Sequence, residues 1–379
     1  MCRRSPSIPE FNSASSMTRA TQAIIDLHAL RENYRLAQSK APNSKAYAVI
    51  KANAYGHGLL PCAQALTDVA DGFAVACVDE AIELRQNGIL LPVLVLEGAM
   101  DQAECQTAAD LDLEMVVHKQ DQVHWLAAVK GAAVRVWIKV DSGMHRLGFS
   151  TQEVPGLVTM LRGMDTVHDI HLMSHFACAD ESGSAVTAQQ IKNLETLDPI
   201  KLERSLCNSA AILTLPQCHG ELIRPGIMLY GGSPLQQKLG SQLQLQPVMT
   251  LQSEVIAMHE LAAGEGVGYG HSFVTERPTK LAVVAIGYGD GYPRRAPPGT
   301  PVMIRGKKYP LAGRVSMDMI TVDVTDSDVS LGDVVTLWGT GLDADEIAGH
   351  CHTISYELFC QVTPRVKRQY LGRAPVPKS

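Results

Sequence analysis

Residues 45–58 read KAYAVIKANAYGHG, an apolar run that stops at a lysine and continues into a turn of small residues. The apolar run has the length and composition of a buried β-strand. Lys51 follows it directly, and Gly56 and Gly58 mark a tight turn after the lysine. A cation at the end of a buried strand is typical of a functional position when the strand ends line a site.

Strand-like segments of this kind alternate with helical patterns between residues 17 and 247. In chain order they are KAYAVIK, GFAVAC, LPVLVLEG, LEMVVH, VRVWIKVD, DIHLMSHF and ERSLCNS. The segments between them carry apolar residues at helical spacing, as in VDEAIELRQNG. Repeated strand–helix units predict a parallel sheet covered by helices, and this many repeats favour a TIM-type (β/α)8 barrel over an open sheet. The predicted fold class is therefore α/β.

The pattern changes near residue 248, where short β-branched segments separated by turn residues begin. These segments are MTLQSEVIAMHEL, KLAVVAIGYGDGYP, TPVMIRGKKYPLAG, DMITVDVTD and DVVTLWG. They predict a mainly β domain over residues 248–379, after a barrel domain over residues 17–247. Residues 1–16, MCRRSPSIPEFNSASS, lack the apolar core of a signal peptide, and we interpret them as a vector-derived or disordered leader.

Composition argues against several classes of partner and location. Of the 379 residues, 46% are hydrophobic and 19% are charged, which is typical of a soluble globular chain. The net charge of −6 and the lack of Lys/Arg runs disfavour nucleic acid and anionic membranes as partners. Nine cysteines without CxxC pairs indicate reduced thiols in a cytoplasmic protein. No apolar stretch approaches the roughly 20 residues of a membrane-spanning helix.

Polar residues follow several of the other predicted strands, as Lys51 follows the first. They are Lys139, Asp141, Met144, Arg146, His175, Asn208, Ser209, Arg224, Gly226 and Ile227. We expect them to meet at one rim, because the carboxyl ends of barrel strands line a common site. The hydroxyl of Ser209 and the amides of Gly226 and Ile227 are suited to cradling a phosphate. A lysine in a dry barrel mouth has a lowered pKa, and only a neutral amine condenses with a carbonyl.

Other readings of these motifs fit less well. The AVIK stretch occurs in protein kinases, but no glycine-rich loop precedes it and no HRD or DFG sequence follows. His168, His171 and His175 could suggest a metal site. On a strand, however, His171 and His175 share one face while His168 points the other way, and no carboxylate signature accompanies them. No metal is predicted. The glycines of GEGVGYG and GYGDGYP do not match a nucleotide-binding loop.

The motifs taken together resemble those of the alanine racemases, a family of enzymes that use pyridoxal 5′-phosphate (PLP). In order they are AVIKANAYGHG, KVDSGMHRLGF, SHFACADE, CNSAA, IRPGIMLYG, VGYG, AIGYGDGYPR and GRVSMDM. The resemblance covers essentially Met17 to the end. The resemblance implies a homodimer with shared active sites that interconverts L-alanine and D-alanine by two-base proton transfer through a PLP aldimine. The product would serve peptidoglycan synthesis or alanine catabolism, and the sequence leaves that choice open.

The resemblance also implies roles toward the cofactor. Lys51 matches the lysine that binds PLP covalently and acts as one catalytic base. Arg224 matches the arginine facing the pyridine nitrogen, and His175 the histidine that hydrogen-bonds this arginine. The positions that bind the phosphate are Tyr55, Ser209, Gly226 and Ile227. Arg146 matches the residue near the cofactor hydroxyl and the substrate carboxylate. Lys139 matches a lysine that is N-carboxylated in many members and braces that arginine with an added negative charge.

In the β domain the resemblance implies three further roles. Tyr269 matches the second catalytic base, supplied by the partner subunit. Because neutral tyrosine is a poor base, nearby positive charge must favour its phenolate. Met317 matches a backbone donor to the substrate carboxylate, and Tyr288 a residue at the entrance that limits substrate size. Pro364 stands where many members carry a phosphate-binding tyrosine, so that contact is expected to be absent or replaced.

Two alternatives to an alanine-specific enzyme are a broad-specificity amino-acid racemase and a non-catalytic PLP-binding protein. A non-catalytic protein would lack the β domain and Tyr269. A PLP decarboxylase would be expected to carry an acidic residue where Arg224 stands, because a protonated arginine keeps the pyridine nitrogen neutral.

Overall fold

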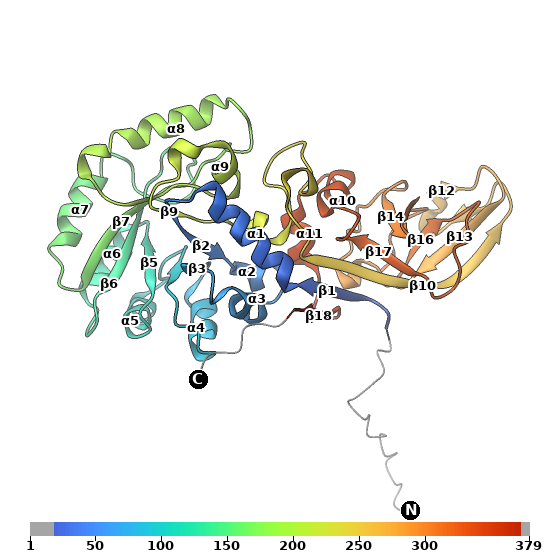
Figure 1. Ribbon diagram of the computed structural model, residues 1–379, viewed down its shortest axis with the longest axis horizontal. Helices are drawn as coiled ribbons and strands as arrows, with labels where there is room; N and C mark the ends of the chain where they lie inside the picture. Colours follow the sequence, from blue (N-terminus) through green and yellow to red (C-terminus); the bar gives the residue numbers. More distant parts are fainter. Residues whose placement is uncertain (1–18, 373–379) are drawn as a thin grey trace, which may run out of the picture.

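The computed structural model describes residues 19–372, so the predicted leader lies outside the described residues. Figure 1 shows two parts along the long axis of the molecule, a helix-covered barrel and a sheet-rich part. The predicted fold class, a (β/α)8 barrel followed by a mainly β domain, is confirmed. Within the described residues, no helix is both long and apolar enough to cross a membrane.

Eight parallel strands form the barrel, in the spatial order β8-β7-β6-β5-β4-β3-β2-β9. Their bounds are β2 (Lys45–Val49), β3 (Gly72–Val75), β4 (Val93–Val95), β5 (Glu114–Val117), β6 (Val134–Lys139), β7 (Val167–Met173), β8 (Arg204–Ser205) and β9 (Leu222–Ile223). The Arg224 amide donates to the Cys207 carbonyl at 2.9 Å, which brings the ends of β8 and β9 together. The barrel is therefore nearly closed, and the carboxyl ends of its strands surround one mouth.

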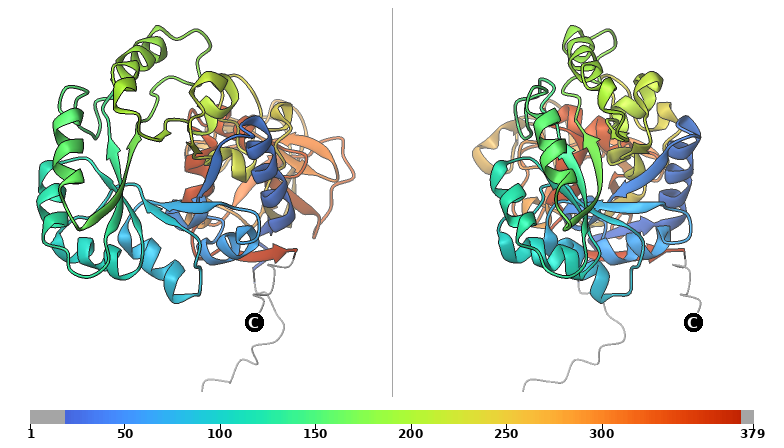
Figure 2. Two further views of the ribbon diagram at one scale, coloured as in Figure 1. Left: turned by 60° about the vertical axis from the view of Figure 1, so that its left-hand side comes forward. Right: turned by 90° about the vertical axis from the view of Figure 1, so that its left-hand side faces the viewer.

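Helices alternate with the strands and cover the barrel from outside (Figure 2). They are α1 (Leu27–Lys40), α2 (Lys51–Tyr55), α3 (Leu59–Leu66), α4 (Val78–Gln86), α5 (Gln102–Asp110), α6 (Gln120–Ala127), α7 (Val154–Arg162), α8 (Ala185–Glu195) and α9 (Ser209–Thr214), with 3-10 turns η1 (Asp198–Ile200), η2 (Pro216–Cys218), η3 (Ile227–Tyr230) and η4 (Ser241–Leu243). Every residue of β3, β4 and β5 is buried, as expected for parallel strands packed on both faces.

An eight-stranded sheet and a two-stranded hairpin dominate the second part. The large sheet follows the path β15-β14-β17-β10-β1-β18; off this path, β13 pairs with β10, and β16 pairs with β13. The elements of the second part between residues 248 and 372 are β10 (Met249–Leu261), β11 (Gly266–Val267), β12 (Phe273–Val274), β13 (Thr279–Val284), β14 (Pro301–Ile304), β15 (Lys307–Pro310), β16 (Ile320–Asp323), β17 (Val334–Trp338), β18 (Lys367–Leu371), α10 (Ala344–His350), α11 (Ser355–Gln361), η5 (Tyr269–His271) and η6 (Tyr288–Asp290). The hairpin consists of β11 and β12.

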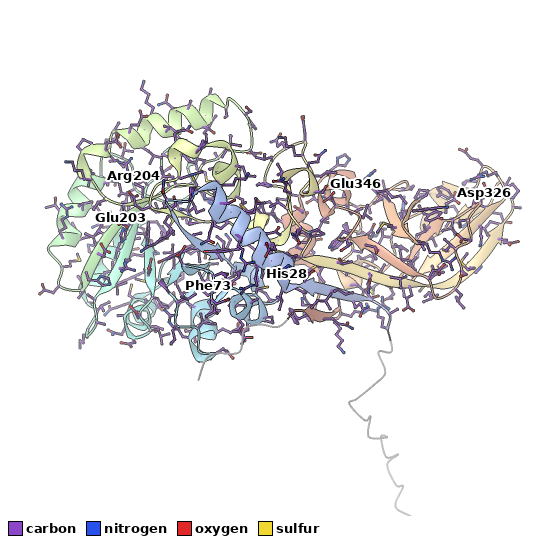
Figure 3. The ribbon with its side chains drawn as sticks, in the orientation of Figure 1. His28, Phe73, Glu203, Arg204, Asp326 and Glu346 are labelled. Carbon is purple, nitrogen blue, oxygen red and sulfur yellow. The ribbon has the colours of Figure 1, made fainter. Side chains whose placement is uncertain are left out.

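Strand β1 (Gln22–Asp26) precedes the barrel in sequence but pairs with the second sheet. It runs antiparallel to β10 and parallel to β18, with Ile25 opposite Met249 on one side and Tyr370 on the other. One hydrophobic cluster extends through both parts, so they pack against each other. In Figure 3, Phe73 lies within the barrel and Asp326 at the far tip of the second part.

Candidate active site

Lys51 follows β2 after one residue, Ile50, and opens a backbone turn of unusual handedness. Ala52, Asn53 and Ala54 have φ/ψ near +53°/+50°, and Tyr55 has φ of +51°. Left-handed conformation costs a residue with a Cβ about 1–2 kcal/mol, so four in succession cost on the order of 4–8 kcal/mol. We call residues 51–58 the Lys51 turn. Strain of this kind persists only where surrounding contacts impose it, and such strain concentrates at functional sites.

The surroundings of Lys51 favour its neutral form. Burial lowers the pKa of the Lys51 amine below its usual value, and the Arg146 guanidinium lowers the pKa further. The carboxylates of Glu97 and Glu80 act in the opposite direction with smaller effect. Glu80 also accepts a hydrogen bond from the Ala52 amide at 2.6 Å, which ties the turn to α4. The amine is therefore more nucleophilic at neutral pH than that of a surface lysine.

A small polar cradle lies where the loops after β8 and β9 meet. Ser209 Oγ accepts hydrogen bonds from the Gly226 amide at 2.8 Å and, more weakly, from the Met228 amide at 3.4 Å. A Cβ added to Gly226 would lie 2.8 Å from Tyr55 Oη, so only glycine leaves this space open. The predicted phosphate-binding residues Tyr55, Ser209 and Gly226 are thus neighbours, and Ile227 follows in the same loop.

Arg224 lies at the end of β9 and is 4% exposed. Its guanidinium donates to the Ser174 carbonyl at 2.8 Å and to the Ser205 hydroxyl. Burial lowers the pKa of Arg224 to about 10, which still leaves it charged at neutral pH. Ser174 and Ser205 come from the ends of β7 and β8, so three neighbouring strands hold one cation in place.

The contacts of His175 differ from those that the resemblance implies. His175 Nε2 lies 3.2 Å from Asn208 Nδ2, while Arg224 contacts the two serines instead. An amide nitrogen can only donate, so His175 Nε2 is the acceptor and its ring is neutral. Burial, followed by the charge of Arg224, holds the pKa of His175 well below its usual value, which agrees with a neutral ring.

Lys139 and Arg146 also lie at the mouth, where Arg146 supplies positive charge and Lys139 a buried amine. Burial lowers the pKa of Lys139 well below its usual value, and the guanidiniums of Arg224 and Arg146 lower it further. Arg146 belongs to an exposed loop. That loop is held by Asp141 Oδ1, which accepts from the amides of Gly143, Met144 and His145 at 3.0, 3.1 and 3.0 Å.

The three residues predicted in the β domain lie on its surface. Tyr269, Met317 and Tyr288 are 69%, 53% and 40% exposed. Main-chain hydrogen bonds join the segment of Tyr288 to the segment of Met317. The Tyr288 amide donates to the Ser316 carbonyl, and the Gly289 amide donates to the Met317 carbonyl. Tyr269 opens η5 between β11 and β12, and Figure 1 shows β12 far from α2 along the long axis. Within one chain, Tyr269 therefore does not meet Lys51.

A cavity of about 480 Å³ lies beside Tyr288 and carries two arginines, Arg294 and Arg295, and the carboxylate Glu357. Sequence reasoning identified only Tyr288 there. It also missed Arg314. A Cβ placed on Gly270, the residue after Tyr269, would lie 3.5 Å from Arg314 Nη1. Arg314 is thus a charged neighbour of the loop that carries Tyr269. Its position in GRVSMDM, beside a predicted site residue, is a signal that could have identified it.

Other residues that contact the site are less easily recognised from the sequence. Ser174 and Ser205 stand at strand ends, as the predicted residues do, but serine is common in such positions. The Tyr230 ring stacks on the Tyr55 ring with centroids 4.8 Å apart. The Tyr356 ring also contacts Tyr55, with centroids 5.9 Å apart. Only the folded chain brings these two tyrosines to the cradle.

Comparisons with known proteins agree along almost the whole chain. Residues 25–234 match the family model "Alanine racemase, N-terminal domain" and residues 248–370 match "Alanine racemase, C-terminal domain". An alanine racemase of Stutzerimonas stutzeri is 50% identical over 357 residues, covering 93% of this chain and 100% of the relative. A catabolic alanine racemase of Pseudomonas putida is 48% identical, covering 93% and 99%.

A solved structure extends the likeness to three dimensions. The crystal structure of the biosynthetic alanine racemase from Pseudomonas aeruginosa is similar with a TM-score of 0.92 at 46% sequence identity. The match covers 94% of this chain and 100% of that one. Since two family models, full-length relatives and this structure agree, the chain belongs to the alanine racemase family.

Proposed function

We propose that this protein interconverts L-alanine and D-alanine with PLP as cofactor. The observation that carries the proposal is the meeting of Lys51, the Tyr55–Ser209–Gly226 cradle and the buried Arg224 at one barrel mouth. Membership of the alanine racemase family supports the same reaction. The names of the relatives include both biosynthetic and catabolic enzymes, so they leave the physiological role open.

The residues present fit PLP. Space for a phosphate remains at Gly226 because it lacks a Cβ, and the hydroxyls of Tyr55 and Ser209 border that space. The Ile227 amide completes the proposed phosphate set. Lys51 supplies an amine with a lowered pKa for covalent attachment, and Arg224 supplies a fixed cation for the pyridine nitrogen. Bound PLP supplies an electron sink that makes the α-proton of an amino acid removable.

The chain's own groups then divide the remaining work. Lys51 holds or returns the α-proton on one face of the substrate, and Tyr269 does so on the other, as exchange in both directions requires. Arg224 only donates, so it keeps the pyridine nitrogen unprotonated and limits side reactions. Arg146 and the main chain of Met317 orient the substrate carboxylate, while Tyr288 restricts the side chain to a small one.

A homodimer is part of the proposal. Lys51 and Tyr269 belong to distant parts of one chain, and the exposed Tyr269, Met317 and Tyr288 suit a surface covered by a second copy. Each active site would combine the barrel of one copy with residues 248–379 of the other. Cytoplasmic location is proposed as well, because the cysteines of the described residues are free thiols.

The test is incubation of the purified protein with L-alanine and PLP in deuterium oxide. We expect optical inversion together with deuterium at the α-carbon of D-alanine. Inversion of serine or lysine at comparable rates would favour a broad-specificity racemase instead. Binding of PLP with neither inversion nor deuterium uptake would favour a non-catalytic PLP-binding protein, and either result would overturn the assignment to alanine.

A further inference from the structure

The Lys51 turn is held from outside by the last strand of the chain. Arg368 Nε donates to the Gly56 carbonyl at 2.6 Å, and Tyr370 Oη donates to the His57 carbonyl at 3.1 Å. Both carbonyls belong to the turn whose backbone is left-handed from Ala52 to Tyr55. The donors are more than 300 residues away in sequence, on β18.

The two glycines of the turn are required by residues of the C-terminal segment. A Cβ on Gly58 would overlap Tyr370 Oη, and a Cβ on Gly56 would overlap the Phe359 carbonyl oxygen. Gly56 and Gly58 also have φ of +78° and +109°, which side chains rarely adopt. The close approach of the C-terminal segment thus accounts for both glycines in AYGHG.

The period of the strand explains why these two side chains act together. Arg368 and Tyr370 are two residues apart, so they project from the same side of β18. Gln369, between them, projects to the other side, where its amide donates to Gln22 of β1 at 2.6 Å. Arg368 also donates to the Val362 carbonyl at 2.9 Å, which fixes its guanidinium before it reaches Gly56.

We propose that Arg368 and Tyr370 are positioning residues that clamp the Lys51 turn and so keep Lys51 directed at the cofactor. Without the clamp, the left-handed residues would relax toward ordinary backbone conformations, because that conformation is sterically unfavourable for Ala52, Ala54 and Tyr55. Asn53 alone among them has a side chain that supports the turn, since its Oδ1 accepts a hydrogen bond from the Leu59 amide at 2.8 Å. Lys51 opens this turn, so its amine would move with it. This inference rests on the proposed function, in which Lys51 binds PLP covalently.

The experiment combines hydrogen exchange and PLP titration on cofactor-free protein. Tyr370→Phe removes one hydroxyl, and Arg368→Met removes the guanidinium. Lys367→Met, on the same strand but with an exposed side chain, is the matched control. Mass spectrometry follows exchange of the peptide covering residues 52–58, and visible absorbance follows lysine-bound PLP.

We expect amides of residues 52–58 to exchange at least about tenfold faster in both variants than in the parent, as local opening becomes easier. The PLP concentration for half-saturation should rise in both, with Arg368→Lys intermediate, while Lys367→Met matches the parent. Unchanged exchange in Tyr370→Phe and Arg368→Met would overturn the clamp. Faster exchange with unchanged PLP half-saturation would overturn the positioning role and leave only a structural contact.

Failure of the proposed function would look different. In that case the parent protein itself would form no lysine-bound PLP band. The exchange measurement would still report on the clamp, because it requires no cofactor. Should Arg368→Met fail to fold, Tyr370→Phe, which keeps the aromatic ring, decides the outcome alone.

Discussion

Ser209 Oγ accepts a hydrogen bond from the Gly226 amide at 2.8 Å, which joins the loops that follow β8 and β9. The same glycine leaves open the space beside Tyr55 Oη. A hydroxyl, an amide and a missing side chain thus form one cradle from two loops. The arrangement makes the cradle sensitive to a single added methyl group.

Gly226→Ala should weaken PLP binding with little effect on folding. The φ of Gly226 is −118°, outside the left-handed region, and the main cost we expect is the steric conflict with Tyr55 Oη at 2.8 Å. We expect at least about a tenfold rise in the PLP half-saturation concentration, equivalent to about 1.4 kcal/mol. Absorbance titration of apoprotein measures it. Gly349→Ala, where an added Cβ meets nothing within 4 Å, is the control and should bind PLP normally.

Mixing two inactive variants should restore activity if the sites are shared. Lys51→Ala and Tyr269→Phe should each abolish racemisation alone, since each removes one of the two proposed bases. In a mixed dimer, one site combines the intact Lys51 of one copy with the intact Tyr269 of the other. Random reassociation makes half of the dimers mixed, with one working site of two, so about a quarter of parental activity is expected. Activity that stays at the level of the single variants would contradict sharing.

Lys139 should carry a carbamate when carbon dioxide is present. Burial, followed by the charges of Arg224 and Arg146, lowers the pKa of its amine and favours the neutral form, and a neutral amine adds carbon dioxide with release of one proton. The resulting anion would pair with those guanidiniums. In ¹³C-bicarbonate the parent should show a carbamate carbon signal by NMR, and Lys139→Met should not. A parent spectrum without that signal would refute the modification.

Acid should destabilise the fold partly through His57. The side chain is fully buried, and burial lowers its pKa to about 3. The unfolded chain takes up this proton near pH 6.5, so between pH 6.5 and 3 the unfolded state binds more protons. The stabilising effect is complete above pH 6.5 and is lost as pH falls, by up to about 5 kcal/mol.

Urea unfolding at a fixed protein concentration and at pH 7.5 and 5 measures this effect. His57→Gln should show a smaller loss of unfolding free energy between the two pH values than the parent. His28→Gln, at an exposed position on α1, should lose as much as the parent does. Equal losses in all three proteins would assign the acid sensitivity to other groups.

The sequence by itself determined the barrel, the β domain and the set of residues expected at the mouth. Alternating apolar and helical segments depend on local periodicity, which a single chain displays directly. The positions of Lys51, Ser209 and Arg224 could be predicted because parallel strands of a barrel end at one rim. A residue at a strand end therefore has a predictable place before the structure is known.

Only the tertiary structure decided contacts between segments distant in sequence. β1 pairs with β10 and β18 although it precedes the barrel, because pairing depends on edges that become available only after the second sheet forms. Arg224 is held by Ser174 and Ser205, and His175 turns to Asn208, for reasons of packing that no local pattern contains. The left-handed Lys51 turn is the clearest case. Ala52, Ala54 and Tyr55 have no intrinsic preference for that conformation, so the turn depends on contacts from distant segments, among them Glu80 of α4 and the C-terminal strand.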